Sequence, residues 1–175
     1  MNDPGPSSRE IAIDIAIESP LWEAFDAAPV LAQTAIETAL KHADADLGDA
    51  EVSLLLCDDA FIQTLNRRWR RQDKPTNVLS FPAASGPGDT ALLGDVAVAF
   101  ETMAREAEAE GKSLAAHFSH LIVHGLLHLL GYDHESDEEA EEMESLEREV
   151  LASLGIADPY VPDVSHASKV TAAHE

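Results

Sequence analysis

The residues best suited to chemistry are three histidines in one short stretch, His124-Gly-Leu-Leu-His128-Leu-Leu-Gly131-Tyr-Asp-His134. His124 and His128 are four positions apart, so on a helix they lie on the same face. Gly131 favours the end of this helix and a turn, after which His134 can return as a third ligand. Three imidazoles with an open fourth position are typical of a catalytic zinc site. We therefore predict one divalent metal per chain, with Zn²⁺ as the leading candidate and Ni, Cu and Fe as alternatives that imidazole also suits.

Gly125 limits the chemistry that such a site predicts. The spacing is that of metal-dependent proteases with the pattern H-E-x-x-H-x-x-G-x-x-H, but Gly125 stands where they carry the glutamate base. A metal-dependent protease or amidase is therefore the less favoured class of enzyme. Three ordinary core or solvated histidines are less favoured still, because three independent spacings would have to coincide.

Further polar residues near the histidines are candidates for supporting roles. His120 lies one helical turn before His124, and together with His117 it could support the metal ligands or line a substrate cleft. A pair of partly exposed histidines near a helix start is an equal alternative. Asp133, directly before the third histidine, is a candidate catalytic proton carrier or a carboxylate that supports the ligands. Asp95 could act similarly, although an Asp after Gly often belongs to a turn.

The distribution of charge points to a second functional segment. The 175 residues include 33 Asp and Glu against 11 Lys and Arg, a formal net charge of -22 that disfavours polyanionic partners. However, five of the 11 cations lie within eight positions around Trp69, namely Arg67, Arg68, Arg70, Arg71 and Lys74. Guanidinium groups suit phosphate, and an aromatic ring can stack on an unpaired base. We interpret this basic segment as a nucleic-acid contact; a solvated helix end is the alternative.

The acidic run and the single cysteine have simpler interpretations. The run from Glu135 to Glu149 alternates with an apolar face, so we expect it to be the solvated side of the last helix, without a metal-binding role. Because Cys57 is the single cysteine of the chain, a disulfide framework is excluded, and this cysteine usage suits a reducing compartment.

Periodicity predicts the elements that must position these residues. Strands are predicted at Ile11–Ile17, Val52–Leu56, Asn77–Phe81 and Leu92–Phe100. The first helix is predicted at Leu21–His42, with irregular first turns because of its prolines. Four more helices are predicted: from an Asp58 N-cap to Trp69, at Glu101–Glu110, at Ser113–Leu130, and after a Ser136/Glu139 capping box. The predicted fold is therefore α/β (α+β): one small domain with a mixed sheet of about four strands, about five helices, and a metal site in a cleft on the helix His117–Leu130 and the turn that follows.

The expected organisation is a flexible segment 1–10, a single metal-dependent hydrolase domain 11–160 and a flexible tail 161–175. Pro82–Asp89 is expected to be a surface loop. The most apolar stretch, Leu121–Tyr132, falls short of the ~20 residues that a membrane span needs, and the first residues do not resemble a signal peptide. We therefore expect a cytoplasmic protein without membrane partners.

Three blocks resemble the YbeY family of bacterial metal-dependent endoribonucleases: HGLLHLLGYDH (124–134), LNRRWRRQDKPTNVLSFP (65–82) and LGDV (93–96). The resemblance runs from about Leu54 to Tyr160. It implies a small α/β domain that cleaves single-stranded RNA in late rRNA maturation, at the 3′ end of 16S rRNA, and in ribosome quality control. It also implies rRNA and the small ribosomal subunit or its assembly factors as partners, with no DNA expected.

The same resemblance implies roles for individual residues. The three histidines of the 124–134 motif would hold zinc, and Arg70 would act in catalysis or phosphate binding. Trp69 replaces the family's tyrosine beside that arginine. Independently of the resemblance, the charge pattern predicts that the other cations of the basic segment, with Trp69, bind substrate. Metal-bound hydroxide alone or Asp133 could act as the base. A non-catalytic ribosome-assembly factor stabilised by zinc is the alternative outside enzymes, and it would need a fourth protein ligand.

Overall fold

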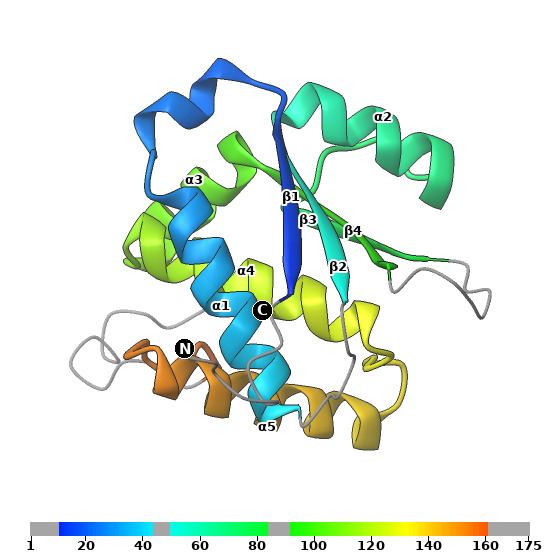
Figure 1. Cartoon of the computed structure of the whole chain (residues 1–175). Helices are drawn as coiled ribbons and strands as arrows, with labels where there is room; N and C mark the ends of the chain where they lie inside the picture. Colours follow the sequence, from blue (N-terminus) through cyan, green and yellow to red (C-terminus); the bar gives the residue numbers. More distant parts are fainter. Residues whose placement is uncertain (1–10, 44–49, 84–91, 161–175) are drawn as a thin grey trace, which may run out of the picture.

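The computed structural model describes residues 11–43, 50–83 and 92–160. Its strands are β1 (Ala12–Ile17), β2 (Glu51–Cys57), β3 (Val78–Pro82) and β4 (Leu92–Ala99). Its helices are α1 (Ala28–His42), α2 (Asp59–Arg70), α3 (Phe100–Glu110), α4 (Leu114–Leu129) and α5 (Asp137–Ser153), preceded by the 3-10 turn η1 (Pro20–Ala24). The predicted α/β class, with four strands and five helices in these residues, is confirmed (Figure 1).

The sheet is mixed and has the strand order β1-β2-β4-β3. β1 pairs with β2 in parallel and β2 with β4 in parallel, whereas β3 runs antiparallel to β4 at the edge. α1 provides the crossover between the parallel strands β1 and β2, whereas the chain passes from β2 to β4 through α2 and the antiparallel strand β3. The antiparallel edge strand β3 lies directly beside α4.

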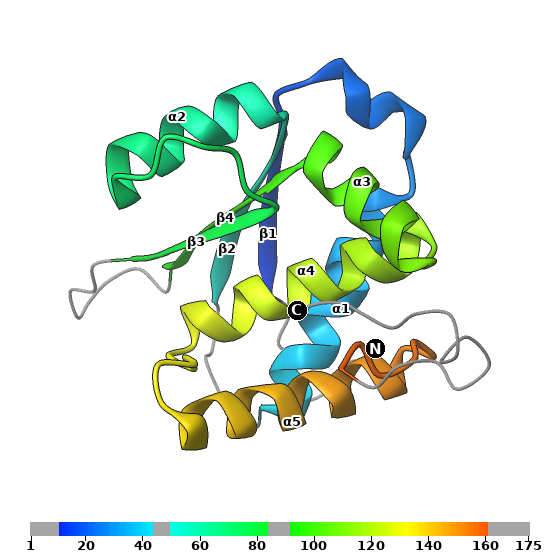
Figure 2. The same ribbon diagram turned by 180° about the vertical axis from the view of Figure 1, so that it is seen from behind.

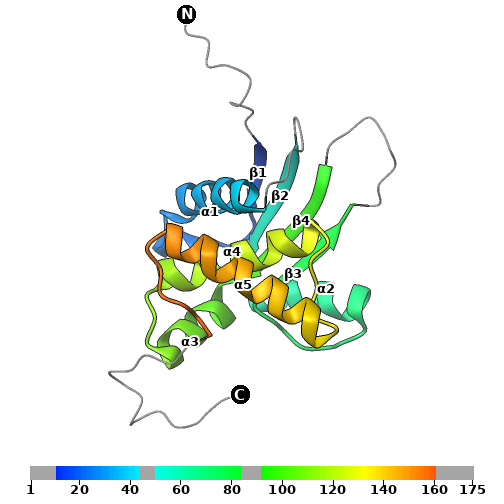
Figure 3. The same cartoon turned by 90° about the horizontal axis from the view of Figure 1, so that it is seen from below.

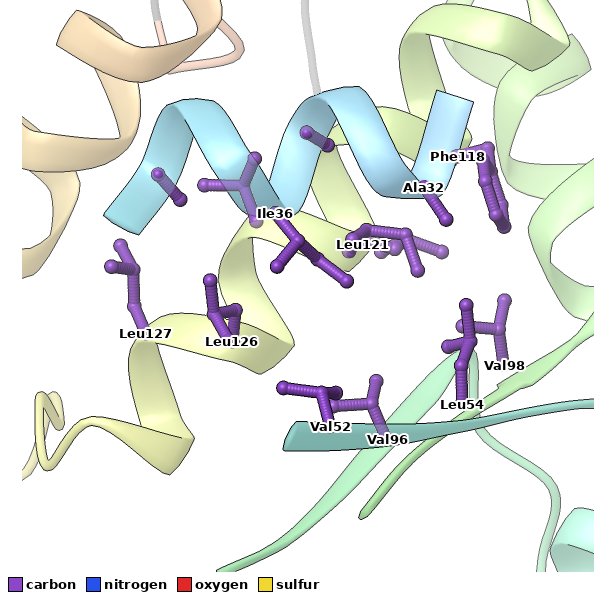
Figure 4. Packing of buried hydrophobic residues seen from close by; sticks show 14 of the residues in the cluster. Ala32, Ile36, Val52, Leu54, Val96, Val98, Phe118, Leu121, Leu126 and Leu127 are labelled. Atoms are coloured by element: carbon purple, nitrogen blue, oxygen red, sulfur yellow. The ribbon is translucent and has the colours of Figure 1, made fainter. Parts of the chain in front are cut away.

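The main core lies between one face of the sheet and the helices α1 and α4. Alternate residues of the central strands face it, among them Val52 and Leu54 of β2 and Val96 and Val98 of β4, as their period of two requires (Figure 4). They meet Ile36 of α1 and a row from α4 that includes Phe118, Leu121, Leu126 and Leu127. α4 is therefore buried along most of its length, between the sheet and α5 (Figure 2).

The opposite face of the sheet is covered by α2 (Figure 1). A small cluster of Cys57, Ile62, Ala97 and Ala99 is buried there. Burial, followed by the negative charge of nearby Asp58, raises the pKa of the Cys57 thiol to about 12, so this thiol is unreactive at neutral pH. α2 begins as predicted, because the Asp58 carboxylate accepts from the Phe61 amide at 2.9 Å.

Several predicted boundaries shift. The helix predicted over Leu21–His42 is divided into η1 and α1, because Pro29 belongs in the first turn of a new helix. α5 lies across α1 and α4 (Figure 3), and Ser136 caps it by accepting from the Glu139 amide at 3.1 Å. The segments 1–10 and 161–175 and most of the predicted 82–89 loop lie outside the described residues. Within the described ranges, no helix is both long and apolar enough to cross a membrane.

Candidate metal centre and its cleft

α4 places two of the predicted ligands one turn apart. The helix begins where Ser113 accepts from the Ala116 amide at 3.0 Å, and it presents His124 and His128 on one half-buried stripe. The Nε2 atoms of these two histidines lie 3.2 Å apart. Two nitrogens bound to one tetrahedral zinc ion at ~2.0–2.1 Å would lie about 3.3–3.4 Å apart, so this spacing fits such an ion.

A glycine turn brings the third histidine back to the same place. Gly131 has φ 103°, a conformation that residues with a Cβ rarely adopt, and its amide donates to the His128 carbonyl at 3.0 Å. The chain then returns so that the His134 ring centroid lies 5.1 Å from that of His128 and 5.8 Å from that of His124. Ligand atoms of the three histidines lie within 4.8 Å of one another, so this cluster could hold a metal ion.

Hydrogen bonds on the far side of two rings select the form that binds metal. His124 Nδ1 donates to Glu147 Oε2 at 2.6 Å, and His128 Nδ1 donates to the Tyr132 carbonyl at 3.0 Å. A neutral imidazole with a proton on Nδ1 has its lone pair on Nε2, so the two facing Nε2 atoms are both free to coordinate. Burial, and then the positive charge that His124 and His134 would carry, lowers the pKa of His128, which favours this neutral form.

Glu147 of α5 corrects the prediction that the acidic run is entirely solvated. Its side chain is 0% exposed and contacts His124, His120 and Tyr160. Burial alone would raise the pKa of Glu147, but hydrogen bonds from His120 and His124 outweigh it and lower the pKa to about 2. The sequence held a signal for this position: Glu147 follows Met143 by four and precedes Val150 by three, on the buried face of the helix.

His120 and His117 lie further along α4, toward its N-terminus, and are not part of the three-histidine cluster. His120 Nε2 lies 3.3 Å from Glu147 Oε1, so it contacts the same carboxylate as His124. His117 is buried and bonds to Glu106 Oε1 at 2.8 Å. Both histidines line the same cleft as His124, His128 and His134.

A cleft of about 810 Å³ connects the histidines to one arginine of the basic segment. The three histidines, His120 and Arg70 all line it, together with Ser80 of β3. Arg70 Nη2 donates to the Ser80 carbonyl at 2.6 Å, and its guanidinium carbon lies 5.1 Å from the Phe81 ring centroid. Ser80 Oγ in turn donates to the Gly125 carbonyl at 3.0 Å. β3 therefore connects Arg70, through Ser80, to the part of α4 that carries the candidate metal ligands.

The other residues of the basic segment are not brought to this cleft. Arg67 lies 3.6 Å from Asp73, and the Arg68 guanidinium lies 5.2 Å from the ring centroid of Trp69, which is 59% exposed. Arg71 ends α2 in a left-handed conformation with φ 60°, and Lys74 is exposed in the following loop. These residues form an exposed basic patch, defined as Arg67, Arg68, Trp69, Arg71 and Lys74, next to Arg70.

The two candidate aspartates are separated by the fold. Asp133 lines the cleft, and its Oδ1 accepts from the His134 amide at 2.8 Å, so it also shapes the turn that returns the third ligand. Asp95 lies on β4 between Gly94 and Val96, and it is exposed while Val96 faces α4. By strand alternation, Asp95 points to the other face of the sheet and away from the cleft.

Gly125 is fixed by packing. A Cβ at this position would lie 2.8 Å from Val96 Cγ1 and 3.1 Å from Ser80 Oγ. α4 therefore approaches the sheet so closely here that there is no room for the glutamate that the protease pattern places at this position.

Taken together, these features define an α/β domain in which a cleft is lined both by a three-histidine cluster that could hold a metal ion and by one arginine. The family model of endoribonuclease YbeY matches residues 23–155, and the chain belongs to this family. Proteins named endoribonuclease YbeY include one from Rhodopseudomonas palustris (strain BisB18), 54% identical over 85% of this chain and 92% of that protein. A second, from Bradyrhizobium sp. (strain BTAi1), is 53% identical over 89% of this chain and 95% of that protein. The solution structure of a Thermotoga maritima protein is 26% identical and aligns with a TM-score of 0.52 over 85% of this chain and 99% of that one.

Proposed function

We propose that this chain is a zinc-dependent hydrolase that cleaves single-stranded RNA internally. The observation that carries the proposal is one cleft lined by both the three-histidine cluster and Arg70. Membership of the endoribonuclease YbeY family and the names of its relatives support RNA as the substrate.

The residues divide the work according to their chemistry. His124, His128 and His134 would hold the metal, and a bound Zn²⁺ would polarise a phosphoryl oxygen and make a bound water more acidic. Arg70 offers a planar set of donors that suits phosphate oxygens, and it would bind the phosphodiester and stabilise the negative charge that develops on it. The carboxylate of Asp133, at the edge of the cleft, would accept a proton from the attacking water.

The exposed basic patch and the family resemblance together specify the RNA substrate further. Trp69 and the cations of the basic patch are exposed, so they would contact an unpaired strand that extends beyond the cleft. The rRNA substrate, with cleavage near the 3′ end of 16S rRNA and partners on the small ribosomal subunit, rests on the family resemblance. This activity would take place in the cytoplasm, where ribosomal subunits mature, and would include a role in ribosome quality control.

Two alternatives fit the site less well. A protease or amidase of the H-E-x-x-H type lacks its glutamate here, and the packing of Gly125 against Val96 explains why this glutamate has no room. A structural zinc site needs a fourth protein ligand, whereas the cluster found within the described ranges consists of three histidines.

The test is cleavage of a single-stranded oligoribonucleotide by the zinc-loaded chain, compared with the same sequence as DNA and as duplex RNA. We expect cleavage of the single-stranded RNA only, and loss of cleavage when a chelator removes the metal. Arg70→Ala should lower kcat by about 10²–10³-fold, as the loss of one preorganised donor does elsewhere, while the metal content stays unchanged. Arg105→Ala, which removes a cation that pairs with Asp59 outside the cleft, is the matched control.

One result would overturn the proposal, and a second would overturn the role of Arg70 in it. The first is cleavage of a fluorogenic peptide library without cleavage of RNA, which would favour the protease or amidase. The second is Arg70→Ala losing its metal together with its activity, because Arg70 would then act in building the site and not on the phosphodiester.

A further inference from the structure

The buried carboxylate of Glu147 contacts three polar side chains. His124 Nδ1 lies 2.6 Å from Oε2, His120 Nε2 lies 3.3 Å from Oε1, and the Tyr160 hydroxyl also donates to Oε1. The side chain is fully buried between α4 and α5. A carboxylate buried this deeply is tolerated only where donors satisfy it, and Oε2 has His124 Nδ1 as its partner among the described residues.

This requirement fixes the proton on His124. An ionised carboxylate can only accept hydrogen bonds, so Nδ1 of His124 must carry a proton. In the neutral imidazole, which is the form that binds a metal, Nε2 is then unprotonated, and this is the atom that faces His128 Nε2 at 3.2 Å. The other tautomer would place a proton between the two histidines, where it would bond to His128 and block both ligand atoms.

The carboxylate itself is held from the C-terminal side of α5. The Tyr160 amide donates to Asp158 Oδ1 at 2.8 Å, Arg148 Nε lies 3.1 Å from Asp158 Oδ2, and the Arg148 guanidinium lies 5.6 Å from the Tyr160 ring centroid. These contacts hold the Tyr160 ring beside Arg148 of α5. Its hydroxyl is thereby directed at Glu147, which stays aimed at His124.

We propose that Glu147 is a positioning residue for the metal site. It holds His124 in the tautomer and the orientation that bind metal, and it makes the imidazole a stronger electron-pair donor toward the ion. The inference rests on the proposed metal-dependent function and deepens it by assigning part of the metal affinity to a residue that does not touch the ion. Outer partners of this kind typically contribute 10–100-fold to metal affinity.

The first experiment reads the tautomer directly in the metal-free wild-type chain. Long-range ¹H–¹⁵N NMR correlations distinguish an imidazole protonated on Nδ1 from one protonated on Nε2. We expect His124 to be protonated on Nδ1, as the contact with Glu147 requires. A predominant Nε2 proton on His124 in the wild type would overturn the inference, whatever happens to any variant.

The second experiment measures Zn²⁺ affinity by competition with a chromogenic chelator. Glu147→Gln should weaken Zn²⁺ binding by about 10–100-fold and should populate the other tautomer of His124, because an amide can donate as well as accept. Glu142→Gln makes the same change in charge at an exposed position of α5 and should leave both readouts unchanged. Tyr160→Phe removes one donor to Glu147 and keeps the carboxylate, and it should weaken Zn²⁺ binding by a few-fold.

The outcomes separate this inference from the proposed function. Wild type that does not bind Zn²⁺ would overturn the proposed metal-dependent function. If a folded Glu147→Gln variant binds Zn²⁺ as tightly as the wild type, the role of Glu147 is overturned and the proposed function is not affected. If Glu147→Gln does not fold, the wild-type tautomer and the affinity of Tyr160→Phe still decide, and equal affinity of Tyr160→Phe and wild type would count against the inference.

Discussion

The two sides of the cleft are built in different ways. On the histidine side, formed by His124, His128 and the turn to His134, two rings have an acceptor behind Nδ1, a buried carboxylate in one case and a backbone carbonyl in the other. On the arginine side, Arg70 is exposed and hydrogen-bonds to one carbonyl of β3, and the basic patch next to it lies outside the cleft. The difference matches what each side would bind under the proposed function.

A metal ion needs lone pairs that converge on one point, so its ligands must be fixed in rotamer and tautomer. A polyphosphate is attracted over several ångströms and slides along a charged surface, so exposed cations serve it without a fixed geometry. We therefore expect substitutions on the histidine side to have large effects that depend on geometry. Substitutions in the basic patch should have small effects that depend on salt.

Removal of a ligand is the largest expected effect. His128→Ala should weaken Zn²⁺ binding by more than about 100-fold, the upper end of the loss seen for partners that only support a ligand, and it should abolish RNA cleavage. Metal content and chelator competition measure the first, and the oligoribonucleotide assay measures the second. His42→Ala removes a histidine at the end of α1 that does not line the cleft and should retain both properties. Full zinc stoichiometry in His128→Ala would break the distinction between the two sides.

Substitution of Gly125 tests the packing that joins the two sides. A Gly→Ala change inside a helix ordinarily stabilises it by up to about 1 kcal/mol. Here the added Cβ would lie 2.8 Å from Val96 Cγ1, so Gly125→Ala should instead lower the free energy of unfolding by about 1–3 kcal/mol. Urea denaturation of the metal-free chain measures it, and a gain in stability would show that α4 can move away from the sheet at no cost.

Glu106 offers a second carboxylate–histidine pair that does not involve a metal ligand. Its burial would raise its pKa, but hydrogen bonds from His117 at 2.8 Å and Asn77 at 2.9 Å outweigh this and lower the pKa below its ordinary value of 4.5. A lowered pKa means that the charged form stabilises the fold above pH 4.5, and this contribution is lost as the pH falls through the folded-state value.

Glu106→Gln should therefore reduce the free energy of unfolding by about 1 kcal/mol at neutral pH, the difference between charged and neutral hydrogen bonds. The gap between wild type and variant should close as the pH falls below 4.5. Denaturation at a series of pH values measures it, with the exposed Glu108→Gln on the same helix as control. Zn²⁺ affinity should stay unchanged. A weakened affinity would mean that this pair also supports the metal site.

The sequence predicted the histidine side better than the arginine side, for a physical reason. The three candidate metal ligands lie within one stretch of eleven residues, so helical spacing and one glycine turn suffice to bring them together. The strands were likewise predicted from local signals, alternation at Ile11–Ile17, a short apolar run at Val52–Leu56 and flanking prolines at Asn77–Phe81. Glu147 was missed because a run of acidic residues hides one member on the apolar face of the helix.

Arg70 could not be separated from its neighbours by periodicity. It contacts the cleft because β3 returns antiparallel to β4 beside α4, and this pairing is set by tertiary structure. The family resemblance singled it out, whereas charge clustering alone assigned the same role to all five cations. The fold then leaves the other four outside the cleft.

Arg68→Ala gives the smallest effect and tests the basic patch. An exposed cation contributes about 0.2–1 kcal/mol, so RNA affinity should fall less than about fivefold at moderate salt. If Arg68 contacts one phosphate, the slope of log affinity against log salt should decrease by about 0.7, the value for single strands. Fluorescence anisotropy with a labelled oligoribonucleotide over a range of salt concentrations measures both, and Arg105→Ala again controls for net charge.

With a net charge of -22 we expect weak, strongly salt-dependent binding by the isolated chain, so that the basic patch orients RNA that the ribosome or a protein partner helps to hold. Tight binding with no dependence on salt would contradict this, because it would require contacts on the arginine side as closely fixed as those around the three histidines.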